Sequence, residues 1–366
     1  MKDRIKVLTM TASGLERKEG ISSIVFDLFS CFERERFQLD MIAFENDNDK
    51  LVEEFRSIGV NIRFLPNRKR KIVNYVRSFA KLLKRERYDA VYLHGSSAIL
   101  SIELVLAAIY GVRKRVVHAH NTACEYRMAD RILRPVFYRT YTAALACGED
   151  AGKWLYGGRP FDVIRNGRKI SAYQFDMGKR RKIRRQLGVS EDMLLVGHVG
   201  NFNRQKNQRY LLGVLRELVR ISRNVRLYFM GEGDARESVM KEADREGLCD
   251  YTVFMGSTEK VPEMLQAMDV MLLPSLHEGL PLVVIEWQIS GLPCIVSDQV
   301  TRECAYTDLV HFLPLDRPLE WAKTAVRIVN GDREESSGRL AIMTRKNGYD
   351  VEQSAEKLQS YFLGRI

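Results

Sequence analysis

The feature that most constrains the fold of this chain is a repeated alternation between short apolar runs and longer amphipathic stretches. Parallel sheets whose strands are joined by crossover helices produce this pattern. In the first half of the chain, stretches with helical periodicity lie near residues 20–33, 72–86, 98–110 and 129–141. The runs predicted to be strands are residues 5–10, 37–44, 60–66, 88–95, 114–120 and 143–148.

A second series of strands and helices follows a highly charged amphipathic stretch at residues 179–192. The 366 residues are enough for two domains, each with its own core. We therefore predict an α/β fold with two Rossmann-like, doubly wound domains at residues 1–170 and 171–349. A last helix, at about residues 350–366, can pack back on the first domain. The strands predicted in the second domain are residues 194–202, 225–231, 251–256, 269–275, 293–297 and 309–314.

Positive charge is concentrated in the middle of the chain. The formal net charge is +11, and residues 51–200 alone carry 29 basic and 13 acidic side chains. A basic middle indicates an anionic partner, which could be nucleic acid, a phosphorylated ligand or an acidic membrane surface. Nucleic acid is disfavoured, because no recognisable reader motif or aromatic platform accompanies the charge.

Cysteine spacing and apolar run lengths indicate the compartment. The six cysteines show no CxxC pair and no zinc-like spacing with histidine, so we expect reduced thiols. The apolar run at the N-terminus is too short for a signal peptide. The most apolar stretch, residues 98–110, is shorter than the roughly 20 residues of a spanning helix. These features predict a cytoplasmic protein.

The richest candidate site follows the predicted strand at residues 269–275. Ligands of open α/β sheets bind beyond the carboxyl ends of strands, where backbone amides and helix N-termini attract anions. Gly279 would let a ligand approach the backbone closely, and Pro281 stands where a helix would take its first residue. The amides that could hold a diphosphate are those of Gly279, Leu280 and Leu282.

Two carboxylates flank this turn. Glu286 could accept hydrogen bonds from a ribose diol, while Glu278 faces a sugar hydroxyl or a developing charge. They form an E-x7-E element, and PSLHEGLPLVVIE resembles the matching segment of retaining GT-B glycosyltransferases of family 4. The resemblance is closest to bacterial enzymes that build capsular or exopolysaccharide repeat units on a lipid carrier. Other segments similar to that family are GHVGNFNRQKN (197–207), VIRNG (163–167), RVVHAHNT (115–122), MGEGD (230–234) and VPEMLQAMDVMLLPS (261–275).

On the donor side, the resemblance implies roles for single residues. Lys206 matches the lysine that binds the donor diphosphate and offsets charge on the leaving group. Family members commonly carry arginine directly after the loop glycine, where this chain has Asn201, and Arg204 could supply the guanidinium instead. Gly20 matches the glycine that lets backbone approach the donor phosphate, although the doubled-glycine form is absent. Gly231 belongs to the turns that hold the nucleotide.

A pair of histidines provides the candidates on the acceptor side. By resemblance, His120 contacts a donor sugar hydroxyl and steadies the transition state, with support from Asn121 and Thr122. His118 lies two residues earlier and would point to the same side of a regular strand, so the sequence does not separate the two.

The resemblance implies a two-domain GT-B enzyme with its donor cleft between the domains. It would move a hexose from a UDP- or GDP-linked sugar to a saccharide acceptor, lipid-linked in capsule or exopolysaccharide synthesis. Retention at the anomeric carbon, without a covalent intermediate, is implied. No cofactor and no metal are expected, because the D-x-D string at residues 47–49 lacks strand-end context. The sequence leaves open an inactive sugar-nucleotide-binding scaffold and a nucleotide-sugar epimerase.

The segment at residues 68–87 offers a second use for the positive charge, with nine basic side chains and one acidic. Such a face beside an acceptor site would suit anionic lipid headgroups or a polyprenyl diphosphate. We therefore expect peripheral association with the inner face of the cell membrane. Helical spacing predicts that the apolar residues of this segment face the core, namely Ile72, Val73, Val76, Phe79, Leu82 and Leu83.

Overall fold

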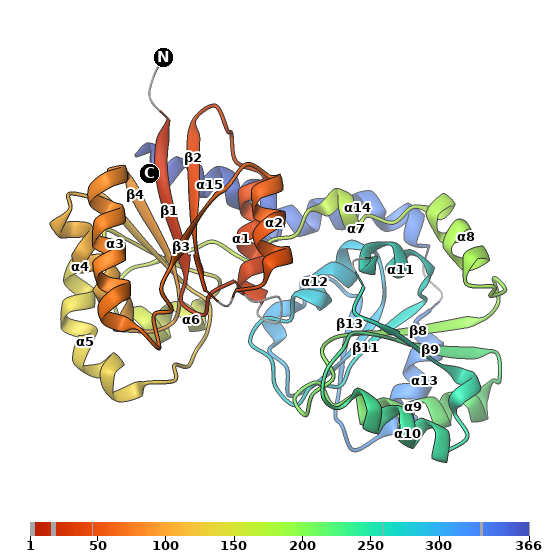
Figure 1. The fold of residues 1–366 in the computed structure, drawn as a ribbon. Helices are drawn as coiled ribbons and strands as arrows, with labels where there is room; N and C mark the ends of the chain where they lie inside the picture. Colours follow the sequence, from red (N-terminus) through yellow and green to blue (C-terminus); the bar gives the residue numbers. More distant parts are fainter. Residues whose placement is uncertain (1–3, 16–19, 46, 259, 330–331, 366) are drawn as a thin grey trace. The chain divides into compact units, whose positions relative to one another are not determined.

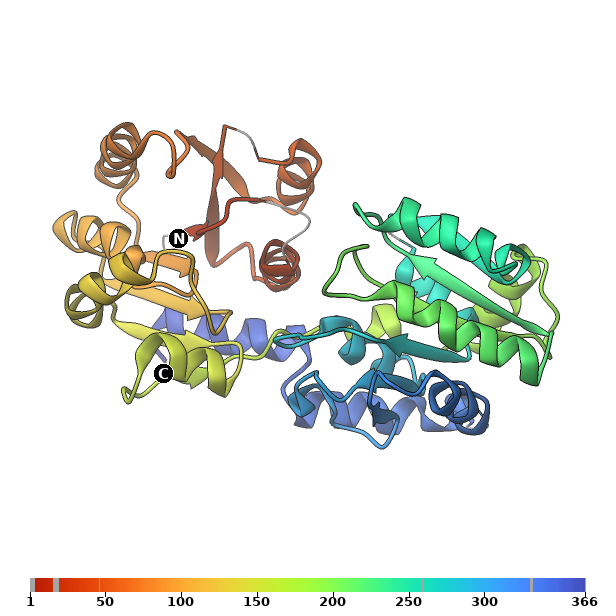
Figure 2. The ribbon, with the colours of Figure 1, turned by 90° about the horizontal axis from the view of Figure 1, so that it is seen from below.

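The computed structural model describes residues 4–15, 20–45, 47–258, 260–329 and 332–365. The chain divides into two compact units (Figure 1): unit 1 comprises Met1–Gly167 and Asp350–Ile366, and unit 2 comprises Arg168–Tyr349. Each unit is built on one parallel sheet with helices around it (Figure 2). The prediction of an α/β fold with two Rossmann-like halves is confirmed.

The sheet of unit 1 has the strand order β3-β2-β1-β4-β5-β6-β7, and all neighbours are parallel. Its order reverses beside β1, which pairs with β2 on one side and β4 on the other. Loops after β1 and β4 therefore diverge and leave a crevice at that edge. The strands are β1 (Ile5–Thr11), β2 (Phe37–Phe44), β3 (Asn61–Leu65), β4 (Ala90–His94), β5 (Lys114–Ala119), β6 (Ala143–Ala146) and β7 (Asp162–Val163).

Helices α3, α4 and α5 pack side by side on unit 1, and α15 packs on α1 (Figure 1). Two short helices, α2 and α6, were not among the predicted elements. The helices are α1 (Gly20–Ser30), α2 (Asp49–Ser57), α3 (Ile72–Glu86), α4 (Ser101–Ile109), α5 (Arg127–Thr140), α6 (Glu149–Tyr156) and α15 (Val351–Leu363), with a 3-10 turn, η1 (Ala98–Leu100), before α4.

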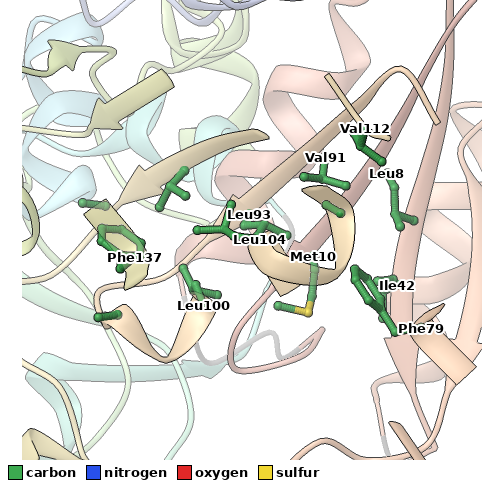
Figure 3. Packing of buried hydrophobic residues seen from close by; sticks show 14 of the residues in the cluster. Leu8, Met10, Ile42, Phe79, Val91, Leu93, Leu100, Leu104, Val112 and Phe137 are labelled. Carbon is green, nitrogen blue, oxygen red and sulfur yellow. The ribbon is translucent and has the colours of Figure 1, made fainter. Parts of the chain in front are cut away.

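The core under these helices is formed by strand residues that face them (Figure 3). Leu93 of β4 lies among side chains from three different helices: Phe79 of α3, Leu104 of α4 and Phe137 of α5. All four are fully buried or nearly so. Each contributes about 1.5–3 kcal/mol of hydrophobic free energy relative to exposure.

The C-terminal helix α15 is held to unit 1 by aromatic contacts. Phe362 lies against the rings of Phe32, Phe37 and Tyr92. Lys114 at the start of β5 donates from Nζ to the carbonyl of Phe362 at 2.5 Å. The last residues of the chain thus complete the domain formed by the first.

Unit 2 has a six-stranded parallel sheet of order β10-β9-β8-β11-β12-β13, which again reverses beside its first strand. The strands are β8 (Leu194–Val199), β9 (Val225–Met230), β10 (Thr252–Gly256), β11 (Val270–Leu273), β12 (Cys294–Ser297) and β13 (Val310–Leu313). The helices are α7 (Ile170–Tyr173), α8 (Met177–Gln186), α9 (Gln208–Ile221), α10 (Arg236–Arg245), α11 (Val261–Ala267), α12 (Leu282–Ile289), α13 (Pro318–Ile328) and α14 (Arg333–Lys346), with 3-10 turns η2 (Cys249–Tyr251) and η3 (Arg302–Cys304).

Part of the positive charge in the middle of the chain is structural. On α8, Arg180 and Arg184 pair with Asp269 at 2.6 and 3.2 Å. Both guanidinium groups also donate to backbone carbonyls at the end of α11, such as that of Ala267. Cations at a helix C-terminus satisfy its last carbonyls and complement its dipole.

The apolar stripe predicted for α3 is partly wrong. Phe79, Leu82 and Leu83 are buried as predicted, but Ile72 and Val73 are 44% and 58% exposed. These two residues lie in the first turn of the helix, before it reaches full contact with the sheet. In the described part of the chain, no helix is both long and apolar enough to cross a bilayer.

Candidate functional site

In unit 2, two candidate functional residues meet where the strand order reverses. Lys206 lies in the loop after β8, and Glu278 lies in the loop after the neighbouring strand β11. The Lys206 Nζ and Glu278 Oε1 atoms are 2.5 Å apart, and both side chains are largely buried. The structure therefore brings together the two catalytic candidates of this half of the sequence.

Other groups of the same two loops fix the Glu278 carboxylate. Ser275 donates from Oγ to Glu278 Oε1 at 2.7 Å. Gln205 donates from Nε2 to Glu278 Oε2 at 3.3 Å and to the carbonyl of His277 at 2.8 Å. Ser275 and Gln205 were not singled out from the sequence, because neither residue type marks a site without its partner.

Close backbone packing holds the loop after β8 in place. Gly231 has a φ of +152°, and a Cβ at this position would lie 2.1 Å from the carbonyl oxygen of Gly200. Gly233, with a φ of +148°, packs in the same way on Phe202. Only glycine permits this conformation and this approach. The predicted nucleotide turn at Gly231 therefore also shapes the loop that carries Lys206.

The turn before α12 presents an open backbone. A Cβ atom added at Gly279 would meet no other atom within 4 Å, and Gly279 is exposed. Pro281 directly precedes the first residue of the helix, Leu282. The amides of Gly279, Leu280 and Leu282 thus lie at the N-terminus of an eight-residue helix, where backbone donors and the helix dipole favour an anion.

Glu286, on α12, is buried and paired with an arginine that the sequence did not single out. Arg168 donates from Nε to Glu286 Oε1 at 2.7 Å, and less than a tenth of either side chain is exposed. Arg168 directly follows VIRNG, so its place beside a motif was the available signal. A carboxylate fixed this firmly has one orientation in which to accept hydrogen bonds.

We predict that Arg168→Ala lowers the free energy of unfolding of unit 2 by about 3–5 kcal/mol, because it removes the ion-pair partner of a buried carboxylate. Urea unfolding measures the change. The pair of Lys241 with Glu237, in which both side chains are more than 70% exposed, provides the control, and Lys241→Ala should cost about 0–1 kcal/mol. Equal losses for the two variants would contradict a structural role for the buried pair.

In unit 1, three histidines stack at the carboxyl ends of β4 and β5. The rings of His118 and His120 are 4.4 Å apart, and His94 lies within 5.1 Å of His120 and 5.6 Å of His118. His94 Nδ1 and His120 Nε2 are hydrogen bonded at 2.8 Å, and the Tyr92 hydroxyl meets His118 Nδ1 at 2.6 Å. His94 was missed, although its place at a strand end was a usable signal.

The three histidines each offer one nitrogen within 4.8 Å of the other two, which is a spacing that could hold a metal ion. However, their rings lie within 28° of parallel. Lone pairs in nearly parallel planes do not converge on one point, as tetrahedral zinc requires. The geometry therefore favours a stack of hydrogen-bonded neutral imidazoles.

Burial decides the protonation of this stack. It lowers the pKa of His118 to about 4. Burial, followed by repulsion from the neighbouring rings, also lowers the pKa of His94 and His120 well below the usual value. In His94 and His120, one ring nitrogen is buried without a hydrogen-bond partner: His94 Nε2 and His120 Nδ1. Unsatisfied buried groups of this kind cost about 1–3 kcal/mol each.

The stack should make the protein sensitive to mild acid. The depressed pKa values mean that only the unfolded histidines take up protons as the pH falls from about 6.5 to 4, so stability is present above this window and is lost within it. Each ring can change the free energy of unfolding by up to about 1.4 kcal/mol per pH unit within this range. Urea unfolding across this range should show a smaller slope for His118→Gln, and an unchanged slope for the exposed His277→Gln. A wild-type stability independent of pH there would refute the assignment.

A cavity of about 570 Å³ opens beside the stack, at the strand-order reversal of unit 1. His94 and Ser96 line it from the β4 side. Isoleucine, leucine and tyrosine side chains form much of its wall, and two cations, Arg68 and Lys69, stand at it. Arg68 pairs at 2.8 Å with Glu103, which is fully buried. The cavity thus combines apolar walls with two ion pairs, Arg68–Glu103 and Lys69–Glu125.

The remaining predicted residues have less direct positions. Asn121 lines the cavity and donates its backbone N–H to Ser96 Oγ at 2.8 Å, while the neighbouring Thr122 is exposed. Gly20 starts α1. Asn201 and Arg204 are exposed in the Lys206 loop. The D-x-D string serves a helix start, because Asn48 caps α2 by accepting from the Leu51 amide.

Two parallel sheets with ligand crevices where the strand order reverses define the GT-B class of glycosyltransferases. Residues 194–330 match the family described as "Glycosyl transferases group 1", and residues 19–171 match "Glycosyltransferase Family 4". The structure superposes on that of Alr3699/HepE from Anabaena, solved in complex with UDP, with a TM-score of 0.80 and 18% identity, over 99% of this chain and all of that one.

Curated relatives agree over nearly the full length. The putative glycosyltransferase EpsF of Bacillus subtilis is 30% identical, over 96% of this chain and 94% of its own. A UDP-Gal:alpha-D-GlcNAc-diphosphoundecaprenol alpha-1,3-galactosyltransferase of Escherichia coli is 27% identical (95% and 94%), and the capsular polysaccharide biosynthesis glycosyltransferase CapH of Staphylococcus aureus is 24% identical (94% and 96%). The chain belongs to glycosyltransferase family 4.

Proposed function

We propose that this glycosyltransferase moves a hexose from a UDP- or GDP-linked sugar to a lipid-linked saccharide, with retention at the anomeric carbon. The observation that carries the proposal is the Lys206–Glu278 pair at the strand-order reversal of unit 2. Unit 2 would bind the donor and unit 1 the acceptor. The UDP complex of HepE and the diphosphoundecaprenol acceptor in the E. coli relative's name support a nucleotide-linked donor and a lipid-linked acceptor.

On the donor, Lys206 would bind the diphosphate and neutralise charge that develops as it leaves. The Glu278 carboxylate holds that ammonium in position before the donor arrives. The amides of Gly279 and Leu280, at the start of α12, would bind phosphate oxygens. Glu286, oriented by Arg168, would accept hydrogen bonds from the ribose.

On the acceptor, the cavity of unit 1 fits a lipid diphosphate. Its apolar wall suits the first prenyl groups, and Lys69 and Arg68 suit the phosphates. His120 would contact a sugar hydroxyl as a neutral imidazole, with its Nε2 fixed by His94. The leaving diphosphate would help deprotonate the incoming hydroxyl on the same face.

We predict that Lys206→Ala or Glu278→Ala lowers kcat for nucleoside diphosphate release by about 10²–10³ without unfolding the protein. The assay supplies the donor together with a polyprenyl-diphosphate-linked sugar. The matched control is Lys241→Ala, which removes an exposed lysine that is also paired with a glutamate. Donor binding without turnover would favour the inactive sugar-nucleotide-binding scaffold. Asn201, in place of the arginine common in the family, is the sequence feature that supports this alternative. Turnover without an acceptor sugar would favour the epimerase.

Metal independence is a further part of the proposal, because Lys206 and the helix amides provide the positive charge that a metal ion would otherwise supply. We therefore expect the rate of transfer to be unchanged after treatment with EDTA. Enzyme that loses activity with EDTA and regains it with Zn²⁺ or Mg²⁺ would contradict this expectation. The histidine stack would then be the candidate metal site.

Peripheral attachment to the inner face of the cell membrane completes the proposal. Within residues 68–87, Arg68, Lys69 and Lys71 are paired with glutamates. The cations exposed on α3 are Arg77, Lys81, Lys84 and Arg85, of which Arg85 pairs with Glu86 at 2.9 Å. This row, rather than the run at its N-terminus, is the part of the segment suited to lipid headgroups.

A further inference from the structure

Helix α5 exposes large apolar side chains in a regular row. Met128, Ile132 and Val136 are 77%, 70% and 40% exposed, and they are spaced four residues apart. Side chains at this spacing lie one above the other on a single helix face. Scattered apolar residues on a protein surface are normal, but an aligned row of three is the pattern of a face that is covered by something else.

Exposed arginines flank the apolar row. Arg127 and Arg131 each stand one position before a member of that row, about 100° around the helix axis, and the exposed Arg139 follows Val136 by three positions. The fourth arginine of α5 is different, because Arg134 pairs with Asp130 at 2.8 Å and belongs to the packed side. The outer face of α5 therefore carries three arginines without a carboxylate among them.

The opposite face of α5 packs against the core of unit 1. Phe137 is fully buried in the core of unit 1, and Leu133 packs against the same cluster. Asp130 accepts a hydrogen bond from the backbone amide of Ala98 at 2.7 Å. Helix α5 therefore cannot rotate about its axis to bury Met128 and Ile132 without losing these contacts with the core.

The N-terminus of α5 adjoins the cavity described above. Tyr126, the residue before the helix, lines that cavity and is half exposed. Lys69 and Glu125, paired at 2.7 Å, line the same opening. A surface that covered the outer face of α5 would therefore lie next to the mouth of the proposed acceptor site.

We propose that the outer face of α5 docks on an anionic membrane surface, with Met128, Ile132 and Val136 among the acyl chains and the flanking arginines at the headgroups. An apolar stripe flanked by arginines on a helix that lies flat is suited to this boundary. The role of the docking rests on the proposed lipid-linked acceptor, which it would hold at the mouth of the cavity; the evidence for docking does not depend on that acceptor.

The test is cosedimentation of the full chain with vesicles of phosphatidylcholine containing phosphatidylglycerol. Met128→Ser with Ile132→Ser should weaken binding at least about tenfold, since it removes most of the apolar row. Arg127→Gln with Arg131→Gln should weaken binding about fivefold per arginine on anionic vesicles only. Wild-type protein that does not sediment with the vesicles would overturn the proposal.

Two controls separate docking from general attraction of a basic protein. Arg181→Gln with Lys182→Gln neutralises two exposed cations on α8, and Ile342→Ser removes a 54% exposed isoleucine on α14. Both should bind vesicles as the wild type does; a loss as large as in the α5 variants would overturn the proposal. So would a dimer in sedimentation velocity that Met128→Ser dissociates, because a second copy would then cover this face.

A thermal-shift titration with UDP and GDP distinguishes failure of this proposal from failure of the proposed function. The α5 variants should keep the wild-type shift, since none of their residues lies in unit 2. Vesicle binding without any nucleotide shift would leave the docking surface standing and refute the donor site.

Discussion

The reversal of strand order beside the first strand of each sheet is the constraint on which the rest of this structure depends. The carboxyl ends of parallel strands lie at one edge of the sheet. Where the strand order reverses, the loops that follow the two neighbouring strands run in opposite directions and leave a crevice at that edge. In unit 2 the reversal separates the loops that carry Lys206 and Glu278, and in unit 1 it opens the cavity beside His94. The two sites thus follow from the same rule of connection.

Buried charge in this protein is paired, and the pairing fixes what the sites can do. Arg168 orients Glu286, and Lys206 and Ser275 share an oxygen of Glu278. The same principle applies to the scaffold, where arginines of α8 close the end of α11. Isolated charges in such positions would cost several kcal/mol. Part of the net positive charge of the middle segment is therefore used for folding, and exposed cations remain on α3, α5 and α8.

Periodicity predicted every strand of the two sheets except the two-residue β7, because burial on both faces demands continuous apolar runs for the longer strands and one apolar stripe for each helix. It failed locally at Ile72 and Val73, since helical spacing does not show where a helix begins to touch the sheet. Short helices such as α2 and α6 span too few turns to give a clear period. Of the site, several residues within motifs were found, but Gln205 inside the 197–207 motif, Arg168 directly after VIRNG, and His94 at the end of β4 were missed.

The sequence by itself determined the fold class, the family and the motif residues at the strand ends, because these depend on local patterns and fixed spacings. Only the tertiary structure decided which side chains pair with them: Glu278 with Lys206, 72 residues apart, and Glu286 with Arg168, 118 residues apart. It also decided that the apolar side of α5 divides into a buried face and an exposed row. Helical periodicity places residues around an axis, but the direction of the core is set by the packing of the whole domain.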